Sequence, residues 1–275
     1  MIELHGMPAV RWTGAGGAAA TAMLQGAQLV SWIPAGGAES IFVSERSPFE
    51  PGRAIRGGVP VVFPQFAERG PLANHGFART QSWRLASEEG GRAVFELASS
   101  AETLRLWPHA FALGLAIEVS GTRLRMELRV RNIGEGAFSF NAALHTYLRV
   151  RDAAKVRLEG LEGTRYVDRG SAAPGVETRR ALDAAEPVDR VYLKAPRETR
   201  LADADREIVI SQAGFPDTVV WNPGRERTAS MADMPSDGYR RMLCVEAAAF
   251  ESPIGLQPAG EWTGSQEIAV SGSPP

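Results

Sequence analysis

The stretch T-R-L-R-M-E-L-R-V-R, residues Thr122 to Arg131, decides the fold class. It alternates apolar and charged side chains, and successive side chains of a β-strand point to opposite faces. One face would carry Leu124, Met126, Leu128 and Val130, and the other Arg123, Arg125, Glu127 and Arg129. This pattern is typical of an antiparallel strand with one buried and one solvated face. The preceding stretch, Phe111 to Val119, is largely apolar and predicts a second strand.

Outside this pair, the chain consists of short apolar runs separated by turns that are rich in glycine and proline. We expect further strands at Ala27–Trp32, Glu39–Val43, Trp83–Leu85, Val94–Leu97, Ala137–Val150, Glu207–Ile210, Thr218–Trp221, Met242–Ala248 and Gln266–Val270. Between residues 152 and 206 we expect only weak strands, with a loop at Asp168–Gly175. No long amphipathic helix is evident. The sequence therefore predicts an all-β protein, a large antiparallel β-sandwich that forms one domain over residues 1–275.

The segment from Ile55 to Arg79 reads I-R-G-G-V-P-V-V-F-P-Q-F-A-E-R-G-P-L-A-N-H-G-F-A-R. Pro60 and Pro64 remove two backbone donors, which disfavours a regular strand although the run is apolar. The Gly57-Gly58 pair permits a positive φ or a close approach of the backbone. Buried irregular backbone is uncommon because its polar groups are hard to satisfy. We therefore expect this segment to pack inside the protein and to contribute to a site.

Composition and charge exclude several classes of function. The 275-residue chain is 44% hydrophobic and 23% charged, as is usual for a soluble globular protein. Its net charge of -2 gives no electrostatic case for nucleic acid or an acidic membrane as partner. The single cysteine, Cys244, excludes an intramolecular disulfide and a cysteine-based metal cluster. Without a visible signal peptide or an apolar run of about 18 residues, we expect a cytoplasmic protein, and we expect a monomer.

Glu246 is the sharpest oddity, because it interrupts the core-strand pattern M-L-C-V-E-A-A-A. A carboxylate there is costly unless it is paired or solvated by a pocket, so a salt bridge to an arginine and a functional role both stay open. His145, in N-A-A-L-H-T-Y-L, is either a satisfied core residue or a catalyst. His75 closes the irregular segment, and Asp189, in V-D-R-V-Y, is a weaker candidate.

A carboxylate with one or two histidines from separate strands can form a general acid–base set. The same residue types could bind zinc, but neither H-x-x-x-H nor H-x-H occurs, so we expect no metal. A G-x-S-x-G motif, a P-loop and a dinucleotide fingerprint are also missing, so we expect no cofactor. His109, which follows Trp107-Pro108, and His5, near the N-terminus, carry weaker signals.

Taken together, the motifs resemble the glucose-6-phosphate 1-epimerases, which are the hexose-6-phosphate mutarotases of the aldose 1-epimerase family. The motifs are I-R-G-G-V-P-V-V-F-P-Q-F, N-H-G-F-A-R-x-x-x-W, W-P-H-x-F, F-N-A-A-L-H-T-Y, V-D-R-V-Y, V-V-W-N-P, M-L-C-V-E-A-A and L-Q-P-A-G-E-W-T-G-S-Q-E. Each is weak alone, but together they span nearly the whole chain in the right order. One departure is Ala67, which stands where a glycine is usual after P-Q-F.

The resemblance implies a galactose-mutarotase-like supersandwich that interconverts the α and β anomers of a hexose 6-phosphate, glucose 6-phosphate foremost, without a cofactor. By the family pattern, Glu246 would be the general base and His145 the general acid. His75 and Asp189 would hold sugar hydroxyls, Arg56 and Arg79 would bind the phosphate, and Gln65 would be a further substrate-binding residue.

Three other functions stay open at this point. An aldose 1-epimerase for unphosphorylated sugars would not need the two arginines that flank the irregular segment. A non-catalytic sugar-binding protein would not need both Glu246 and His145. A structural β-sandwich without a ligand is the third alternative. Only two of the 30 basic residues are lysines, so the arginine-rich composition weakens any argument from a single arginine.

Overall fold

The computed structural model describes residues 1–170 and 174–272. Its strands are β1 (Ile2–Leu4), β2 (Met7–Thr13), β3 (Ala19–Met23), β4 (Leu29–Ile33), β5 (Val61–Val62), β6 (Arg84–Glu89), β7 (Arg92–Ala98), β8 (Phe111–Ser120), β9 (Arg123–Asn132), β10 (Phe138–Leu144), β11 (Tyr147–Arg149), β12 (Arg157–Glu159), β13 (Arg165–Asp168), β14 (Pro174–Val176), β15 (Ala181–Leu182), β16 (Val188–Tyr192), β17 (Glu198–Asp203), β18 (Arg206–Ala213), β19 (Asp217–Asn222), β20 (Met242–Leu256) and β21 (Glu261–Gly272). The helices are α1 (Ala101–Leu106) and α2 (Gly224–Ala229), with short 3-10 turns at Ala15–Gly17, Ala78–Thr80 and Gly238–Arg241. No helix in these ranges is long and apolar enough to span a membrane.

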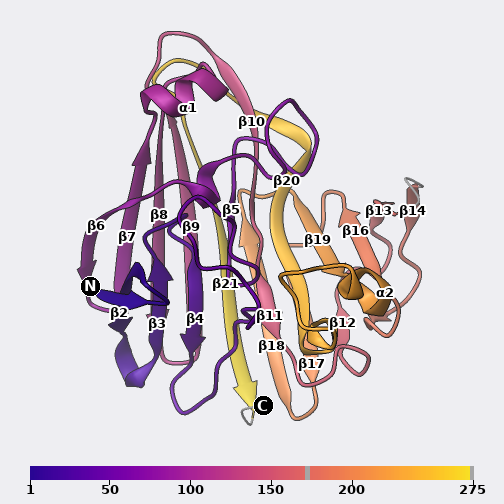
Figure 1. Ribbon diagram of the computed structural model, residues 1–275. Coiled ribbons are helices and arrows are strands. Elements are labelled where there is room, and N and C mark those ends of the chain that lie inside the picture. The colour runs from indigo at the N-terminus through magenta and orange to yellow at the C-terminus, as the bar shows by residue number, and fades with distance from the viewer. Residues whose placement is uncertain (171–173, 273–275) are drawn as a thin grey trace.

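The strands form three antiparallel sheets. A nine-stranded sheet has the order β15-β12-β17-β18-β21-β9-β8-β7-β6, and an eight-stranded sheet has the order β14-β13-β16-β19-β20-β10-β5, with β11 paired to β20. A four-stranded sheet, β1 to β4, holds the N-terminus. Figure 1 shows β2 to β4 beside β6 to β9 on one side of the molecule, and β13, β14 and β16 on the other. The predicted antiparallel β-sandwich is therefore confirmed.

The alternating stretch behaves as its pattern requires. In β9, Leu124, Met126 and Leu128 are buried in the main core. They pair across the sheet with core residues of β8, for example Leu128 with Leu115 and Met126 with Ile117. The charged residues of β9 lie on the opposite, solvated face, where exposed arginines and glutamates pair with one another. Because apolar and charged residues alternate along β9, the strand has one face in the core and one face in solvent.

The eight-stranded sheet is buried on both faces near its centre, which is unusual for an antiparallel sheet. In β20, Leu243, Val245 and Ala247 point into the main core. Cys244 and Ala248 belong to a second apolar cluster on the other face, and Glu246 shares their parity. The carboxylate of Glu246 therefore points away from the main core, towards the side of the sheet that the irregular segment covers.

Two strand predictions are wrong in detail. Glu39–Val43 does not form a strand and contributes only isolated bridges at Ile41 and Val43. The Glu39 carboxylate accepts hydrogen bonds from the backbone N–H groups of Trp32 and Ile41, both at 2.9 Å, which removes donors that a ladder would use. The predicted strand Ala137–Val150 is interrupted at His145, whose N–H donates to the carbonyl of Pro60 instead. The predicted loop at Asp168–Gly175 is shorter, since β14 begins at Pro174, and positions 171–173 lie outside the described residues.

The segment from Ile55 to Arg79 is irregular, as expected, with β5 its only strand among the described elements. Residues 57–67 and 76–78 are buried, whereas most of residues 68–74 are exposed, so the expectation that the segment packs inside holds only in part. Gly57 and Gly58 both have a positive φ and lie against neighbouring backbone. A Cβ at Gly57 would lie 2.4 Å from the carbonyl oxygen of Phe42, and one at Gly58 would lie 2.3 Å from that of Leu29. Only glycine fits these two positions, and they hold the segment against the sheet.

Candidate active site

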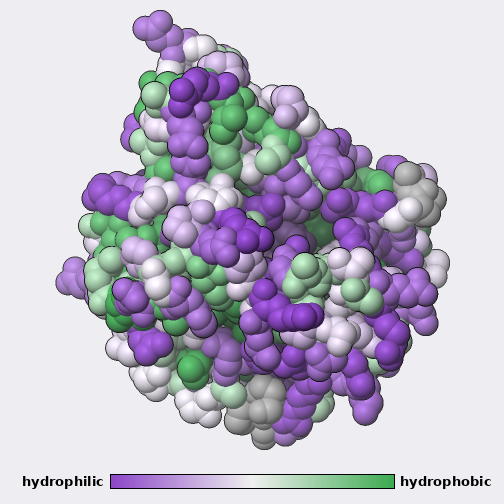
Figure 2. Space-filling view, viewed as in Figure 1, coloured by the Kyte–Doolittle hydropathy of each residue, from purple (hydrophilic) through white to green (hydrophobic). Residues whose placement is uncertain are grey.

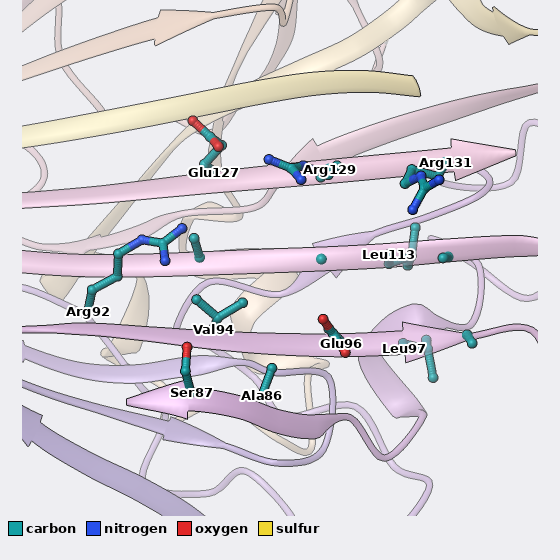
Figure 3. Close-up of a pocket in the computed structure, with 14 residues that line it drawn as sticks. Ala86, Ser87, Arg92, Val94, Glu96, Leu97, Leu113, Glu127, Arg129 and Arg131 are labelled. Atoms are coloured by element: carbon teal, nitrogen blue, oxygen red, sulfur yellow. The ribbon is translucent and has the colours of Figure 1, made fainter. Parts of the chain in front are cut away.

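The structure contains two depressions of interest. The larger, about 520 Å³, lies on the outer face of the nine-stranded sheet (Figure 3). It forms because β8 presents only Ala112, Gly114 and Ala116 there, between taller residues of β7 and β9 such as Glu96 and Arg129. Its lining carries three arginines and two glutamates but no histidine. The candidates for catalysis lie elsewhere.

The smaller cavity, about 200 Å³, lies over the eight-stranded sheet and contains almost all the predicted site residues. It is lined by Arg56, Asn74, His75, Arg79, His145, Arg169, Asp189, Trp221, Arg227, Met231 and Glu246. Figure 2 shows a hollow right of centre that is rimmed largely by hydrophilic residues. The floor comes from the sheet, one wall from the irregular segment, and the opposite wall from α2 and the residues beside it.

At the floor, His145 and Glu246 face each other. Nδ1 of His145 lies 3.3 Å from Oε1 of Glu246, and both side chains are more than 90% buried. Nδ1 and the other carboxylate oxygen, Oε2, lack any hydrogen-bond partner among the described residues. Glu246 therefore does not form the arginine salt bridge that the sequence left open, and His145 is not a satisfied core histidine. Both have unused hydrogen-bonding capacity beside a cavity.

Burial shifts both groups of this pair towards their neutral forms. It raises the pKa of Glu246 well above its ordinary value, and the nearby carboxylate of Asp189 raises it further. Burial also lowers the pKa of His145, and electrostatic interactions with His75, Arg79 and Arg56 lower it further. The two groups lie 3.3 Å apart, and burial disfavours the charged form of each.

His75 is fixed by the backbone of its own loop. It has a positive φ of 65°, and its Nδ1 accepts a hydrogen bond of 3.2 Å from the N–H of Ala67. Its ring meets that of His145 edge to face at 5.4 Å. Burial, with Arg79 and Arg169 nearby, lowers the pKa of His75 to about 3, so this imidazole is neutral at physiological pH. Ala67 itself has a φ of 48°, a conformation that glycine adopts more readily than alanine.

Arg56 is held in place from two sides. Its Nε donates to Oδ2 of Asp233 at 3.0 Å, and its Nη1 donates to the hydroxyl of Tyr147 at 3.1 Å. The ring of Tyr147 stacks on that of His145, with centroids 4.8 Å apart and planes 9° apart. Tyr147 therefore links the arginine wall of the cavity to the imidazole at its floor. Arg79 is less constrained, since one amino group donates to the carbonyl of Asn74 at 2.7 Å.

Asp189 lies at the other end of the cavity, between two arginines. Arg169 and Arg227 each approach its carboxylate at 3.5 Å. Burial raises the pKa of Asp189, while the two arginines oppose this shift. Gln65 is the one predicted site residue that the structure does not bring to the cavity lining. Its side-chain amide bonds instead to Ala67 and Leu72, and so closes the loop that carries His75.

The profile of the family described as aldose 1-epimerase matches residues 8–269, which is nearly the whole chain. The chain belongs to the aldose 1-epimerase family.

Two relatives match most of the chain. The chain is 38% identical to a protein of Cenchrus ciliaris named "Putative glucose-6-phosphate 1-epimerase", over 98% of this chain and 86% of the relative. It is 41% identical to an Escherichia coli protein of the same name, over 82% of this chain and 78% of the relative.

Solved structures agree with the sheet topology described above. A crystal structure from Salmonella typhimurium, titled as a "putative mutarotase", superposes with a TM-score of 0.86 at 36% identity, covering 93% of this chain and 88% of that one. A galactose mutarotase-like protein from Clostridium acetobutylicum superposes with a TM-score of 0.71 at 16% identity, covering 96% and 95% of the two chains. The fold of this epimerase-family member is thus galactose mutarotase-like.

Several residues that line or support the cavity were not predicted from the sequence. These are Arg169, Arg227, Trp221, Met231, Tyr147 and Asp233. Tyr147 and Trp221 lie inside motifs that marked the resemblance, so a signal for them existed. Arg169 and Arg227 had none, because an arginine in a chain with 30 basic residues and almost no lysine is not distinctive.

Proposed function

We propose that this protein interconverts the α and β anomers of a hexose 6-phosphate, with glucose 6-phosphate as the foremost substrate. One observation carries the proposal. A buried, incompletely hydrogen-bonded carboxyl–imidazole pair forms the floor of a cavity that is lined by four arginines. The pair supplies acid–base chemistry, and the arginines match a dianion. The names of the full-length relatives support the same substrate.

The reaction opens and recloses a cyclic hemiacetal. The Glu246 carboxylate removes the proton of the anomeric hydroxyl, the bond between the anomeric carbon and the ring oxygen breaks, and His145 delivers a proton to that oxygen. The open-chain aldehyde turns about one carbon–carbon bond and recloses by the reverse transfers. Protons and electrons balance within the sugar and the pair. The raised pKa of Glu246 makes its carboxylate a stronger base than an exposed glutamate.

Binding of the phosphorylated substrate would raise the pKa of His145, the general acid. The positive charges of Arg56 and Arg79 lower the pKa of His145. A phosphate dianion between these two guanidinium groups would compensate their charge, so the pKa of His145 would rise and its protonated form would become accessible. A sugar without the phosphate lacks this effect. His75, neutral in this environment, and Asp189 are placed to bind the sugar hydroxyls.

Arg79→Ala and Arg56→Ala should each lower kcat/KM for glucose 6-phosphate by about ten- to a hundredfold, mainly through KM. A charge-assisted contact is worth about 1.5–3 kcal/mol, and the phosphate lies far from the bond that breaks. Unphosphorylated glucose should lose much less. Anomer exchange of both sugars would be followed by NMR and polarimetry at fixed, low ionic strength.

Arg105→Ala, which removes an exposed arginine from α1, is the matched control. It should leave kcat/KM unchanged for both glucose 6-phosphate and glucose. Arg79→Ala is the cleaner of the two test variants, because removing Arg56 also deprives Asp233 and Tyr147 of a partner. Equal losses on glucose and glucose 6-phosphate in both variants would mean that these arginines support the cavity wall. The substrate would then be an unphosphorylated aldose.

The pH profile provides a second test. Glu246 must be ionised to act as base, so kcat/KM should fall as the pH drops through the pKa of Glu246 in the free enzyme. Because burial and Asp189 raise that pKa, this acid limb should lie above pH ~4.3, the ordinary value for glutamate. Asp189→Asn removes the raising charge and should move the limb to lower pH, whatever it does to the rate.

The substrate's own phosphate titrates near pH ~6, so the profile should also be measured with unphosphorylated glucose, which has no group ionising there. Glu159→Gln, on β12 and outside the cavity lining, serves as the control for the loss of a negative charge. An acid limb at the ordinary glutamate pKa, or one that Asp189→Asn leaves in place, would contradict the assignment of Glu246 as the base.

A further inference from the structure

Cys244 lies directly beside the carboxyl–imidazole pair, although it does not line the cavity. It precedes Glu246 by two residues in β20, so both side chains leave the sheet on the same face. His145 lies at the break between β10 and β11. Just after this break, Tyr147 of β11 pairs with Cys244 of β20. The Cys244 sulfur, one carboxylate oxygen of Glu246 and one ring nitrogen of His145 all lie within 4.8 Å of one another.

We propose that Cys244, Glu246 and His145 form an inhibitory binding site for a thiophilic divalent cation such as Zn²⁺ or Cd²⁺. These three ligand types are those that zinc accepts, with bonds of about 2.0–2.3 Å. In a tetrahedral site, such bonds place two ligand atoms about 3.3–3.6 Å apart. Nδ1 of His145 and Oε1 of Glu246 already have this spacing, at 3.3 Å. The sulfur has to approach by little more than ~1 Å to complete the set.

The ligand atoms are also available. Nδ1 of His145 and Oε2 of Glu246 are buried without hydrogen-bond partners among the described residues, and the cavity gives an ion access to both side chains. Cys244 is the free thiol of the chain and is fully buried. An ion bound to Nδ1 and Oε1 would give the orphaned Nδ1 a partner, and a water from the cavity would complete four-coordination.

The charge balance favours a dication despite the arginines. On binding, the thiol and the carboxyl each release a proton to solvent, and the resulting thiolate and carboxylate cancel the two positive charges of the ion. Burial and the neighbouring Glu246 raise the pKa of the Cys244 thiol, which opposes this step. A coordinating thiol is nevertheless deprotonated by the metal, and this requirement selects Zn²⁺ or Cd²⁺ over Mg²⁺ or Ca²⁺, which prefer oxygen ligands.

The site would inhibit because the ion occupies the atoms that move protons. It binds the carboxylate of Glu246 and the imidazole of His145, so neither can serve the sugar. No short metal-binding spacing marks this set, because its histidine is about a hundred residues from the other two ligands. The three ligands come together only because β20 pairs with β10 and β11, the strands on either side of His145.

The test titrates the full chain with chelator-buffered Zn²⁺ and follows anomer exchange of glucose 6-phosphate. Wild-type protein should be inhibited reversibly, with activity restored by EDTA, and Mg²⁺ should have no effect. Cys244→Ala and Cys244→Val should each raise the half-inhibitory free Zn²⁺ concentration by at least about ten- to a hundredfold, each measured relative to its own uninhibited rate. Cys244→Ala leaves a small void, whereas Cys244→Val introduces a bulkier side chain. If both variants raise the half-inhibitory concentration, the effect cannot be attributed to one kind of packing defect.

Co²⁺ provides a readout that does not depend on activity. Bound Co²⁺ should show a sulfur-to-metal charge-transfer band in wild-type protein and none in Cys244→Ala, even if the substrate assignment were wrong. His5→Ala and His109→Ala remove the two histidines outside the cavity and should change neither readout. Equal Zn²⁺ inhibition of wild-type and Cys244→Ala protein, or Co²⁺ bound without the charge-transfer band, would overturn the proposal.

Discussion

Glu246→Gln should lower kcat for anomer exchange of glucose 6-phosphate by about a hundred- to ten-thousandfold, the usual contribution of a positioned general base. Glutamine keeps the shape of glutamate but cannot accept the anomeric proton. KM should change little, because the arginines that we propose to bind the phosphate are untouched. The rate would be measured by NMR exchange spectroscopy and by polarimetry after addition of a single anomer.

The fold should tolerate this substitution. Burial raises the pKa of Glu246 and so disfavours its ionised form, and a glutamine of the same shape carries no charge that has to be buried. The melting temperature should therefore stay within a few degrees of wild type. A variant that is clearly destabilised yet retains the full rate would return Glu246 to a structural role, because breaking a buried ion pair costs about 3–5 kcal/mol.

His145→Asn is expected to slow the same reaction by about a hundred- to ten-thousandfold, through loss of the proton delivered to the ring oxygen. The effect should exceed that of either arginine variant, because the acid acts on the reacting atoms while the arginines bind a remote group. The same single-anomer assay applies, with the NMR exchange rate as the independent measurement.

His145 also packs on Tyr147, so packing has to be separated from proton transfer. His145→Phe keeps an aromatic ring stacked on Tyr147 but carries no proton to transfer, and should be as slow as His145→Asn. Tyr147→Phe is the complementary variant, because it keeps the stack and removes only the hydroxyl that Arg56 contacts. A His145→Phe variant with near wild-type rate would show that the imidazole is needed for packing alone.

Much of the site could be anticipated from local sequence. Glu246 stood out because burying a carboxylate in an apolar strand is costly. In the structure this carboxylate lines a cavity and lies beside His145. His75 stood out because it ends an apolar but irregular segment. Gln65 shows the limit of carrying a residue over from a family motif, since its amide bonds to its own loop rather than reaching the cavity.

By itself, the sequence determined the all-β class and the faces of individual strands, because side-chain alternation is a local property with a period of two residues. It could also mark unusual residues within those strands. Which strands become neighbours depends on long-range pairing, which leaves almost no trace in local pattern. The interruption between β10 and β11 is one example, because the N–H of His145 bonds to Pro60, about 85 residues earlier in the chain.

Only the tertiary structure decided how the charged groups are distributed around the cavity. It placed Arg56 between Asp233 and Tyr147, and put Asp189 between Arg169 and Arg227. It also brought Cys244 within 4.8 Å of both members of the pair. The physical reason is that pKa values depend on burial and on the distance to other charges, and metal coordination depends on the distances between ligand atoms. These distances are set by the three-dimensional fold and not by the spacing of residues along the sequence.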